Sequence, residues 1–479
     1  MPPSAVAAKR VLEERARTIT QPQHEVIPAP LKTALYAESN VLKIWAVASK
    51  ALCSASPPTL YPEYTGKDKT YVYRALDFWT SGFFPGSLYL LLERQTLYPT
   101  FYNRASETNT NNPLPHRLHL HHLCQWWTTN LHQNAAKRDT HDVGFMIAPW
   151  AIKAWELHRD PQAYGSLVLA AHSLASRFDP VVQSLRSWDV CHTKRYSFTD
   201  LSTDFLVIID NMLNLELLFW VARETGDRAL YEIAVAHART TQKNHIRADK
   251  STCHVVNYHS DGEVKAKFTH QGYSDESCWS RGQSWGILGF MQTYEWTKDE
   301  AFLQTARELA DYFLDHLPED AVPYWDFDAP VNSSCPRDTS AGMVACCGLV
   351  LLYKALKDSD ESAAKHYLSS ALRILEGTVS KFKMPSPAQF DIDISGTDLP
   401  TFPANEPTKQ PGTLIISSQK TTNGMNGTSA KLPETILDAA TVCNYEFASR
   451  RWADHGLVYA DYYFLLLGNM LLELGLVSS

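Results

Sequence analysis

The chain has 479 residues, a net charge of −8 and 44% hydrophobic residues, which is typical of a water-soluble globular protein with a large core. Acidic residues outnumber basic ones and no block of lysine or arginine occurs, so we expect no nucleic-acid partner. The longest apolar run, Ala341 to Tyr353, is too short to span a bilayer and is interpreted as a buried helix, so we expect no membrane partner.

The first part of the chain contains several prolines and one candidate helix, AAKRVLEERART. We expect residues 1–60 to form an N-terminal extension and residues 61–479 to form a single catalytic domain. The start lacks the apolar core of a secretory signal, and the 9 cysteines show neither a CxxC pair nor the spacing of a secreted disulfide framework. These features predict a cytoplasmic protein.

From about residue 70 onward, helix signals dominate and alternate between two kinds. Segments of the first kind are apolar on nearly every side, as helices buried all round are. They are VGFMIAPWAIKAW, LVIIDNMLNLELLFW, SWGILGFMQTYEW and AGMVACCGLVLLY. Each is followed by a polar break with an acid and then by a helix with one apolar face, most clearly in DEAFLQTARELADYFLDHL.

This alternation predicts inner helices covered by outer ones, with about six pairs between residues 70 and 479. We therefore expect an all-α protein with the (α/α)6 barrel architecture. An open helical solenoid that binds partner proteins is the alternative, but the long loops before the inner helices favour the closed ring. Residues from about 384 to 440 are rich in Pro, Gly, Ser and Thr and predict a long irregular insertion.

Two acids stand where inner helices begin: Asp142 in THDVGF and Asp210 in IIDNMLNL. In a closed ring, both would face one central cavity. Paired carboxylates perform acid–base chemistry on glycosides. The alternative interpretation is structural, with Asp142 as a helix cap and Asp210 as a hydrogen-bonded buried acid.

A third entry segment, THQGYSDESCWSRGQSWGILGF, offers further candidates for a sugar-binding site. Arg281 suits a carboxylate because a guanidinium can contact both oxygens at once. Trp279 and Trp285 can stack on a sugar ring. The alternative for Arg281 is an ion pair with a neighbouring acid such as Asp275.

The tract PHRLHLHHLCQWW has the composition of a metal site. Its candidate ligands are His116, His119, His121, His122 and Cys124. No matching carboxylates or second thiol accompany them, so we interpret the tract as a helix surface and predict no metal. The sequence also lacks the phosphate-binding and dinucleotide-binding glycine motifs.

Several segments, taken in order, resemble glycoside hydrolase family 88, the unsaturated glucuronyl hydrolases. They are DFWTSGFFPGSLYLL, THDVGFM, IIDNMLNLELL, THQGYSDESCWSRGQSWG, RDTSAGMVACCGL and YADYYFLLLG. The resemblance implies an (α/α)6 barrel without metal or organic cofactor. It also implies hydrolysis of lyase-generated oligosaccharides that carry a C4=C5 unsaturated uronic acid at the non-reducing end.

The resemblance further implies a role for each candidate residue. Asp210 matches the family's acid/base, which protonates C4 before water adds at C5, and Asp142 matches the second essential acid. The residues that match the unsaturated-uronate subsite are His254, Gln271, Arg281, Trp79, Trp279 and Trp285. His455 and Gly456 stand where a hydroxyl residue is expected to touch the next sugar, so the preference beyond the first ring stays open.

Two related activities remain open on sequence alone. An unsaturated rhamnogalacturonyl hydrolase would share the fold and the chemistry. A sugar epimerase on the same fold would depend on paired histidines, for which His141 and His254 are candidates. In each case we expect a small oligosaccharide or sugar substrate and a monomer or weak homo-oligomer.

Overall fold

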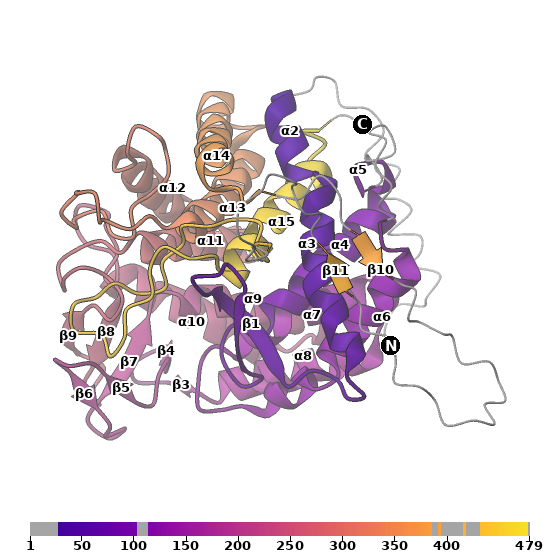
Figure 1. Cartoon of the computed structure of the whole chain (residues 1–479). Coiled ribbons are helices and arrows are strands. Elements are labelled where there is room, and N and C mark those ends of the chain that lie inside the picture. Colours follow the sequence, from indigo (N-terminus) through magenta and orange to yellow (C-terminus); the bar gives the residue numbers. More distant parts are fainter. Residues whose placement is uncertain (1–26, 103–113, 386–390, 394–414, 418–431, 478–479) are drawn as a thin grey trace.

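The computed structural model of the chain describes residues 27–102, 114–385, 391–393, 415–417 and 432–477. Within these ranges the protein is mostly helical, with several small sheets of short strands around the helices (Figure 1). The candidate helix of the first 20 residues and most of the predicted insertion at 384–440 lie outside the described residues.

Six buried helices form the inner part of the fold. Each one contacts the next in chain order, and the last contacts the first, so their contacts close a ring. The six are α4 (Phe83–Leu97), α7 (Val143–His158), α9 (Asn211–Thr225), α11 (Ser280–Thr297), α13 (Thr339–Leu356) and α15 (Val458–Glu473). Four of them, α7, α9, α11 and α13, contain all or most of the segments that the sequence shows as apolar on nearly every side.

A second layer of helices covers five of the inner ones. Each outer helix contacts the inner helix that precedes it along the chain. The outer helices are α6 (Arg117–Thr128), α8 (Pro161–Ala175), α10 (Arg228–Asn244), α12 (Glu300–Asp315) and α14 (Glu361–Phe382). In α12 the predicted stripe of Phe302, Leu309 and Phe313 is buried, which confirms the one-faced pattern.

The outer layer is completed from the N-terminal side of the chain. Helix α2 (Ala29–Leu35) contacts α14 and α15, and α3 (Glu38–Lys50) contacts α4 and α6 (Figure 1). The sequence analysis placed all six helix pairs after residue 70. The structure differs because no outer helix follows α15 among the described residues, so the apolar surface there is covered by helices that precede residue 60. The domain boundaries stay a prediction.

A three-stranded antiparallel sheet leads into the ring. Its strands are β7 (Phe205–Ile208), β8 (Val255–Tyr258) and β9 (Val264–Phe268). The sequence analysis assigned the apolar run before Asp210 to a buried helix, but its β-branched residues form β7 and the helix begins only at Asn211. Both faces of the sheet are covered by apolar clusters, so β7 fixes the position of Asp210 at its end.

The remaining elements are short. The helical ones are α5 (Pro99–Tyr102) and the 3₁₀ turns η1 (Ala51–Cys53) and η3 (Leu131–Ala136). The paired strands are β1 (Leu60–Thr65) with β2 (Tyr71–Ala75), β3 (Phe178–Asp179) with β4 (Ser184–Leu185), β5 (Cys191–His192) with β6 (Ser197–Phe198), and β10 (Asp391–Asp393) with β11 (Ile415–Ser417).

Helix α13 is, by length and composition alone, apolar enough to cross a membrane, and it is the one such helix among the described residues. It is longer than the apolar run that the sequence analysis considered. In the fold, 78% of it is buried, and it contacts α11, α14 and α15. These contacts make α13 a core helix, as predicted.

Helices α7 and α9 approach each other closely at Gly144. The backbone N–H of Phe145 donates to the side-chain oxygen of Asn214 over 2.9 Å. A Cβ built on Gly144 would lie 2.9 Å from Cα of Asn214 and closer still to its amide oxygen. Only glycine therefore fits where the helices that carry the two candidate acids meet.

We expect Gly144→Ala to lower the free energy of unfolding by about 1–3 kcal/mol, because the extra carbon forces the two helices apart. Gly165→Ala is the matched control, since a Cβ at Gly165 of α8 meets nothing within 4 Å. We expect this control to stabilise the protein by about 1 kcal/mol, because alanine is the better helix former. Urea unfolding of both variants measures the difference, and equal effects would contradict the close-approach argument.

Candidate active site

Aspartates precede several inner and outer helices. Most of them cap the helix that follows, including Asp338 before the inner helix α13. Those before α8, α10, α12 and α14 accept hydrogen bonds from backbone N–H groups of the first turn. These are Asp160, Asp227, Asp299 and Asp360. Asp142 and Asp210 hold the same position before α7 and α9, yet neither side chain caps its helix. The structure therefore does not support the capping alternative for Asp142.

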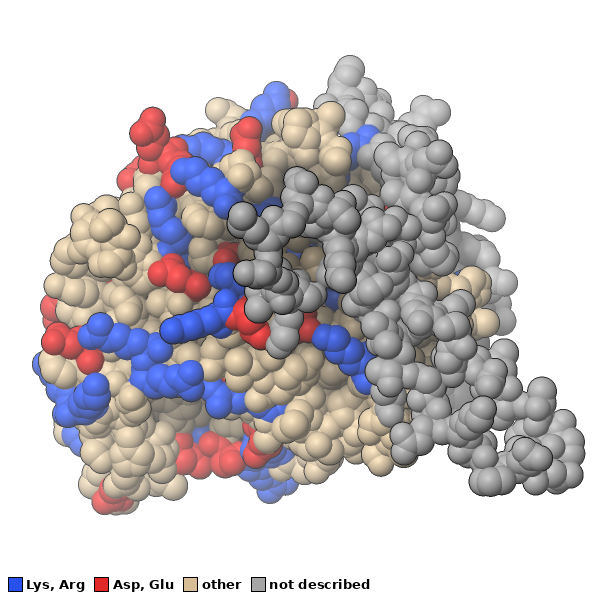
Figure 2. All heavy atoms as spheres, viewed as in Figure 1, with Lys and Arg blue, Asp and Glu red and all other residues tan. Residues whose placement is uncertain are grey.

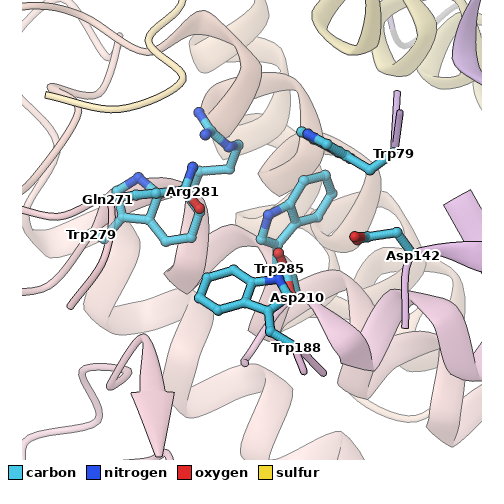
Figure 3. A pocket seen from close by; sticks show the side chains of 8 residues that line it. All are labelled: Trp79, Asp142, Trp188, Asp210, Gln271, Trp279, Arg281 and Trp285. Carbon is cyan, nitrogen blue, oxygen red and sulfur yellow. The ribbon is translucent and has the colours of Figure 1, made fainter. Parts of the chain in front are cut away.

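These two acids, neither of which caps its helix, face one cavity. Its lining residues are Trp79, Asp142, Trp188, Asp210, Gln271, Trp279, Arg281 and Trp285. Figure 3 shows Trp79 and Asp142 on one side, Gln271, Trp279 and Arg281 on the other, with the remaining three side chains between them. Seven of the eight predicted site residues thus lie together, although they come from segments far apart in the sequence.

A buried histidine, His141, joins the two acids. Its Nε2 atom lies 3.0 Å from Oδ1 of Asp210 and 3.3 Å from Oδ1 of Asp142. Asp142 also accepts a hydrogen bond from the Thr140 hydroxyl over 2.7 Å. The side chains of Asp142 and Asp210 are 14% and 15% exposed, so each keeps a limited opening to the cavity.

Together, burial and the neighbouring charges raise the pKa values of Asp142 and His141. Burial raises the pKa of Asp142, and the nearby Asp210 carboxylate raises it further, against the opposing effect of His141. Burial on its own would lower the pKa of His141, but the two neighbouring carboxylates outweigh burial and raise it. The site is therefore equipped to hold protons that exposed carboxylates would release.

Arg281 lines the cavity but is already paired. It is 1% exposed, and its Nη1 lies 2.6 Å from Oδ2 of Asp338. Its guanidinium also donates to the backbone oxygens of Thr441 and Val442. The sequence analysis named Asp275 as an example of an alternative partner, and the structure has an ion pair of that kind with Asp338. Contact with a substrate carboxylate stays a proposal.

The aromatic walls are fixed by packing. Trp79 stands in the turn before α4, with its ring centroid 5.2 Å from that of Tyr459 in α15. Trp285 in α11 is 1% exposed and packs on Phe145. Gln271, on the same wall as Trp279, donates from Nε2 to the backbone oxygen of Val442 over 2.7 Å, which fixes its side-chain amide.

His254 was predicted to contact the substrate, but it is not among the residues that line the cavity. Its ring lies behind Trp279, with centroids 4.5 Å apart. Burial, with the positive fields of His270 and Arg281, lowers its pKa well below the usual value, so the ring is neutral. Its Nδ1 accepts from the backbone N–H groups of His270 and Gln271, so His254 positions the Gln271 segment.

Sequence reasoning missed two residues of the site. Trp188 lines the cavity from an irregular segment that bridges to Thr140 and Leu206, where no periodic pattern marks it. His141 was considered only for an epimerase, although its place directly before Asp142 was the available signal.

The expected contact of residues 455 and 456 with the next sugar stays a prediction, because that sugar would lie beyond the cavity that the two acids face. Neither residue lines the cavity. His455 is 7% exposed and packs on Tyr64. A Cβ on Gly456 would collide with the Thr435 side chain, so a hydroxyl residue does not fit there without displacing it.

The histidine tract forms part of α6, and its side chains make structural contacts. His116 accepts the backbone N–H of Leu118 and so caps the helix. His121 stacks on His158 with ring centroids 4.0 Å apart. Across the part of the chain that the structure describes, no three His, Cys, Asp or Glu side chains group as metal ligands.

Two acids and four tryptophans around one cavity of a helical protein define the site of a glycoside hydrolase. The chain is 36% identical to the unsaturated glucuronyl hydrolase of Formosa agariphila over 303 residues, which cover 62% of this chain and 67% of that protein. It is 33% identical to the unsaturated chondroitin disaccharide hydrolase of Streptococcus pneumoniae over 302 residues, covering 62% and 69%. No family model matches the chain.

Among solved structures, the chain is similar to an unsaturated glucuronyl hydrolase specific for heparin. The TM-score is 0.68 at 28% identity, and the match covers 92% of this chain and 96% of the other. The chain belongs to the unsaturated glucuronyl hydrolase family.

Proposed function

We propose that the protein removes the unsaturated uronic acid from the non-reducing end of lyase-generated oligosaccharides, and that its closed ring with an outer layer is an (α/α)6 barrel. The observation that carries the proposal is a pair of aspartates, Asp142 and Asp210, that do not cap their helices and face one cavity lined by aromatic residues. By contrast, the aspartates before α8, α10, α12, α13 and α14 accept hydrogen bonds from backbone N–H groups of those helices. The family relationship supplies the substrate class.

In the proposed reaction, Asp210 delivers its proton to C4 of the vinyl ether while the developing positive charge is shared by C5 and the ring oxygen. A water molecule then adds at C5 and returns a proton to the Asp210 carboxylate. The product is a hemiketal at C5. Its ring opens by cleavage of the bond between C5 and the ring oxygen, which leaves a hemiacetal at C1 that releases the second sugar.

The cavity supports these steps in its shape and its charges. Tryptophan rings on several sides match the faces of a flat unsaturated ring. The charge of Arg281 is offset by Asp338, so the substrate carboxylate meets a neutral ion pair with further N–H donors. On the face seen in Figure 2, lysine and arginine side chains extend across the middle with acidic ones beside them, so a net charge of −8 does not keep an anionic oligosaccharide away.

The test is an ultraviolet absorbance assay with purified unsaturated disaccharides from chondroitin, hyaluronan, heparin and pectin lyases. Loss of the absorbance of the conjugated double bond reports hydration directly. We expect turnover of at least one uronate from the glycosaminoglycan group, in a protein that is cytoplasmic and monomeric or weakly self-associating. Turnover of the pectin-derived disaccharide alone would instead indicate the rhamnogalacturonyl activity.

The epimerase alternative gains no support from the cavity. It requires two histidines at the substrate, whereas neither His141 nor His254 lines the cavity. Nδ1 of His254 already accepts hydrogen bonds from the backbone N–H groups of His270 and Gln271. Nε2 of His141 contacts Asp142 and Asp210.

A further inference from the structure

The tautomer of His141 is fixed by a backbone carbonyl. Its Nδ1 lies 3.0 Å from the oxygen of Ser187, which can only accept a hydrogen bond, so Nδ1 carries a proton. The same oxygen accepts from Nη2 of Arg177 over 3.2 Å and from the backbone N–H of His141 over 3.2 Å. The ring is therefore held rigidly on the side away from the cavity.

The other ring nitrogen faces the acid pair. Nε2 lies 3.0 Å from Oδ1 of Asp210 and 3.3 Å from Oδ1 of Asp142. A bare lone pair on Nε2 opposite two carboxylate oxygens would be repulsive at these distances, so the arrangement requires a proton between them. The two acids stand directly before different inner helices, α7 and α9, and both contact this one atom.

We propose that His141 is a positioning residue of the reaction, with an Nε2–H that is shared by Asp142 and Asp210. The shared proton holds the two carboxyl groups together and engages Oδ1 of Asp210. The second oxygen of Asp210 is left to carry the proton for C4. This inference rests on the proposed function.

The charges of the cluster agree with this role. An imidazolium between two carboxylates has a net charge of −1, so the cluster can take up one more proton without becoming positive. That extra proton is the one a general acid needs. Without His141, the two carboxylates that now contact the same nitrogen would repel each other, and we expect one to turn away from the cavity.

The pH dependence follows from the groups around the ring. Asp142 and Asp210 face Nε2, Arg177 acts through Ser187, and His237 lies behind, where burial lowers its pKa to about 3 and keeps it neutral. The pKa of His141 is raised in the folded protein. The stabilising contact of its imidazolium with the two acids is therefore fully present below the pKa of an unfolded histidine, and it is lost as the pH rises through the pKa of His141 in the folded protein. His141 therefore contributes to the alkaline limb of the activity profile.

Two substitutions of His141 test the roles of Nδ1 and Nε2 separately. His141→Asn places an amide N–H near Nδ1, so it keeps the bond to Ser187 but loses the acids. His141→Gln reaches the Nε2 position with a permanent neutral donor. We expect the Asn variant to lose about 100-fold in kcat with KM changed less than about 3-fold, and the Gln variant to regain about 10-fold with an altered alkaline limb.

The matched control is His245→Gln. His245 is also buried, but its Nε2 lies 3.1 Å from the backbone oxygen of Val207 and not beside a carboxylate pair. We expect wild-type kcat from this control. An Asn variant of His141 as active as the wild type, or more active than the Gln variant, would overturn the proposal.

A measurement that needs no His141 variant covers the case in which those variants do not fold and the case in which no substrate is turned over. Nitrogen-15 NMR of labelled histidine distinguishes a doubly protonated ring from a neutral one. We expect the His141 signal, assigned as the one moved by Asp142→Asn, to show both nitrogens protonated at neutral pH. A neutral ring with a bare Nε2 would refute the shared proton even if the proposed activity holds.

Discussion

Replacing Asp210 by Asn is expected to lower kcat by a factor of about 1,000 or more, because Asn cannot deliver a proton to C4. The substitution keeps the shape of the side chain and one oxygen toward His141, so the cavity should still bind substrate. The measurement combines the loss of ultraviolet absorbance with calorimetric binding of an unsaturated disaccharide. Lost turnover with retained binding is the expected pair of results.

The chain supplies its own control for this variant. Asp227 also stands before a helix, but its side chain caps α10 by accepting the N–H of Ala229. Asn caps helices as well as Asp, so Asp227→Asn should leave both kcat and stability unchanged. If Asp210→Asn kept a tenth of the wild-type rate, Asp210 would not be the general acid.

Replacing Asp338 by Asn is expected to have the largest effect on stability. Arg281 and Asp338 are 1% and 0% exposed, so the Asn variant leaves a buried guanidinium without its counter-charge. Breaking such a pair from one side costs about 3–5 kcal/mol. The amide can still accept the backbone N–H groups of Ser340 and Ala341 that Asp338 now caps, so the loss reports the charge.

Urea unfolding measures this loss, and Glu232→Gln is the comparison. Glu232 pairs with Arg228 on the surface of α10, where both side chains are more than half exposed. Exposed pairs contribute about 0–1 kcal/mol, so this variant should unfold almost as the wild type does. Equal effects of the two substitutions would show that Arg281 finds other compensation in the cavity wall.

The inner helices could be predicted from sequence because burial on all sides leaves a direct mark on composition. The same reasoning failed before Asp210, where a strand that is covered on both faces is as apolar as a buried helix. It also failed for α2 and α3, since nothing in a short amphipathic segment states which distant helix it will cover.

The site was partly predictable for a related reason. Asp142 and Asp210 stand at recognisable helix starts, and Trp279 and Arg281 lie in a distinctive segment. Trp188 was missed because it sits in irregular chain without a pattern. The partners that decide the chemistry, such as Asp338 for Arg281, are separated by many residues along the chain and become neighbours only in the fold.

Helix α15 closes the ring by contacting α4, and its Tyr459 packs against Trp79 and lies 5.4 Å from the Arg281 guanidinium. During synthesis, the acids at 142 and 210 leave the ribosome hundreds of residues before this helix does. A growing polypeptide thus contains both acids early, but it lacks the helix that packs Trp79 and Arg281 into the cavity wall. Turnover should begin only once α15 has docked, so a translation product that stops before this helix would be inactive.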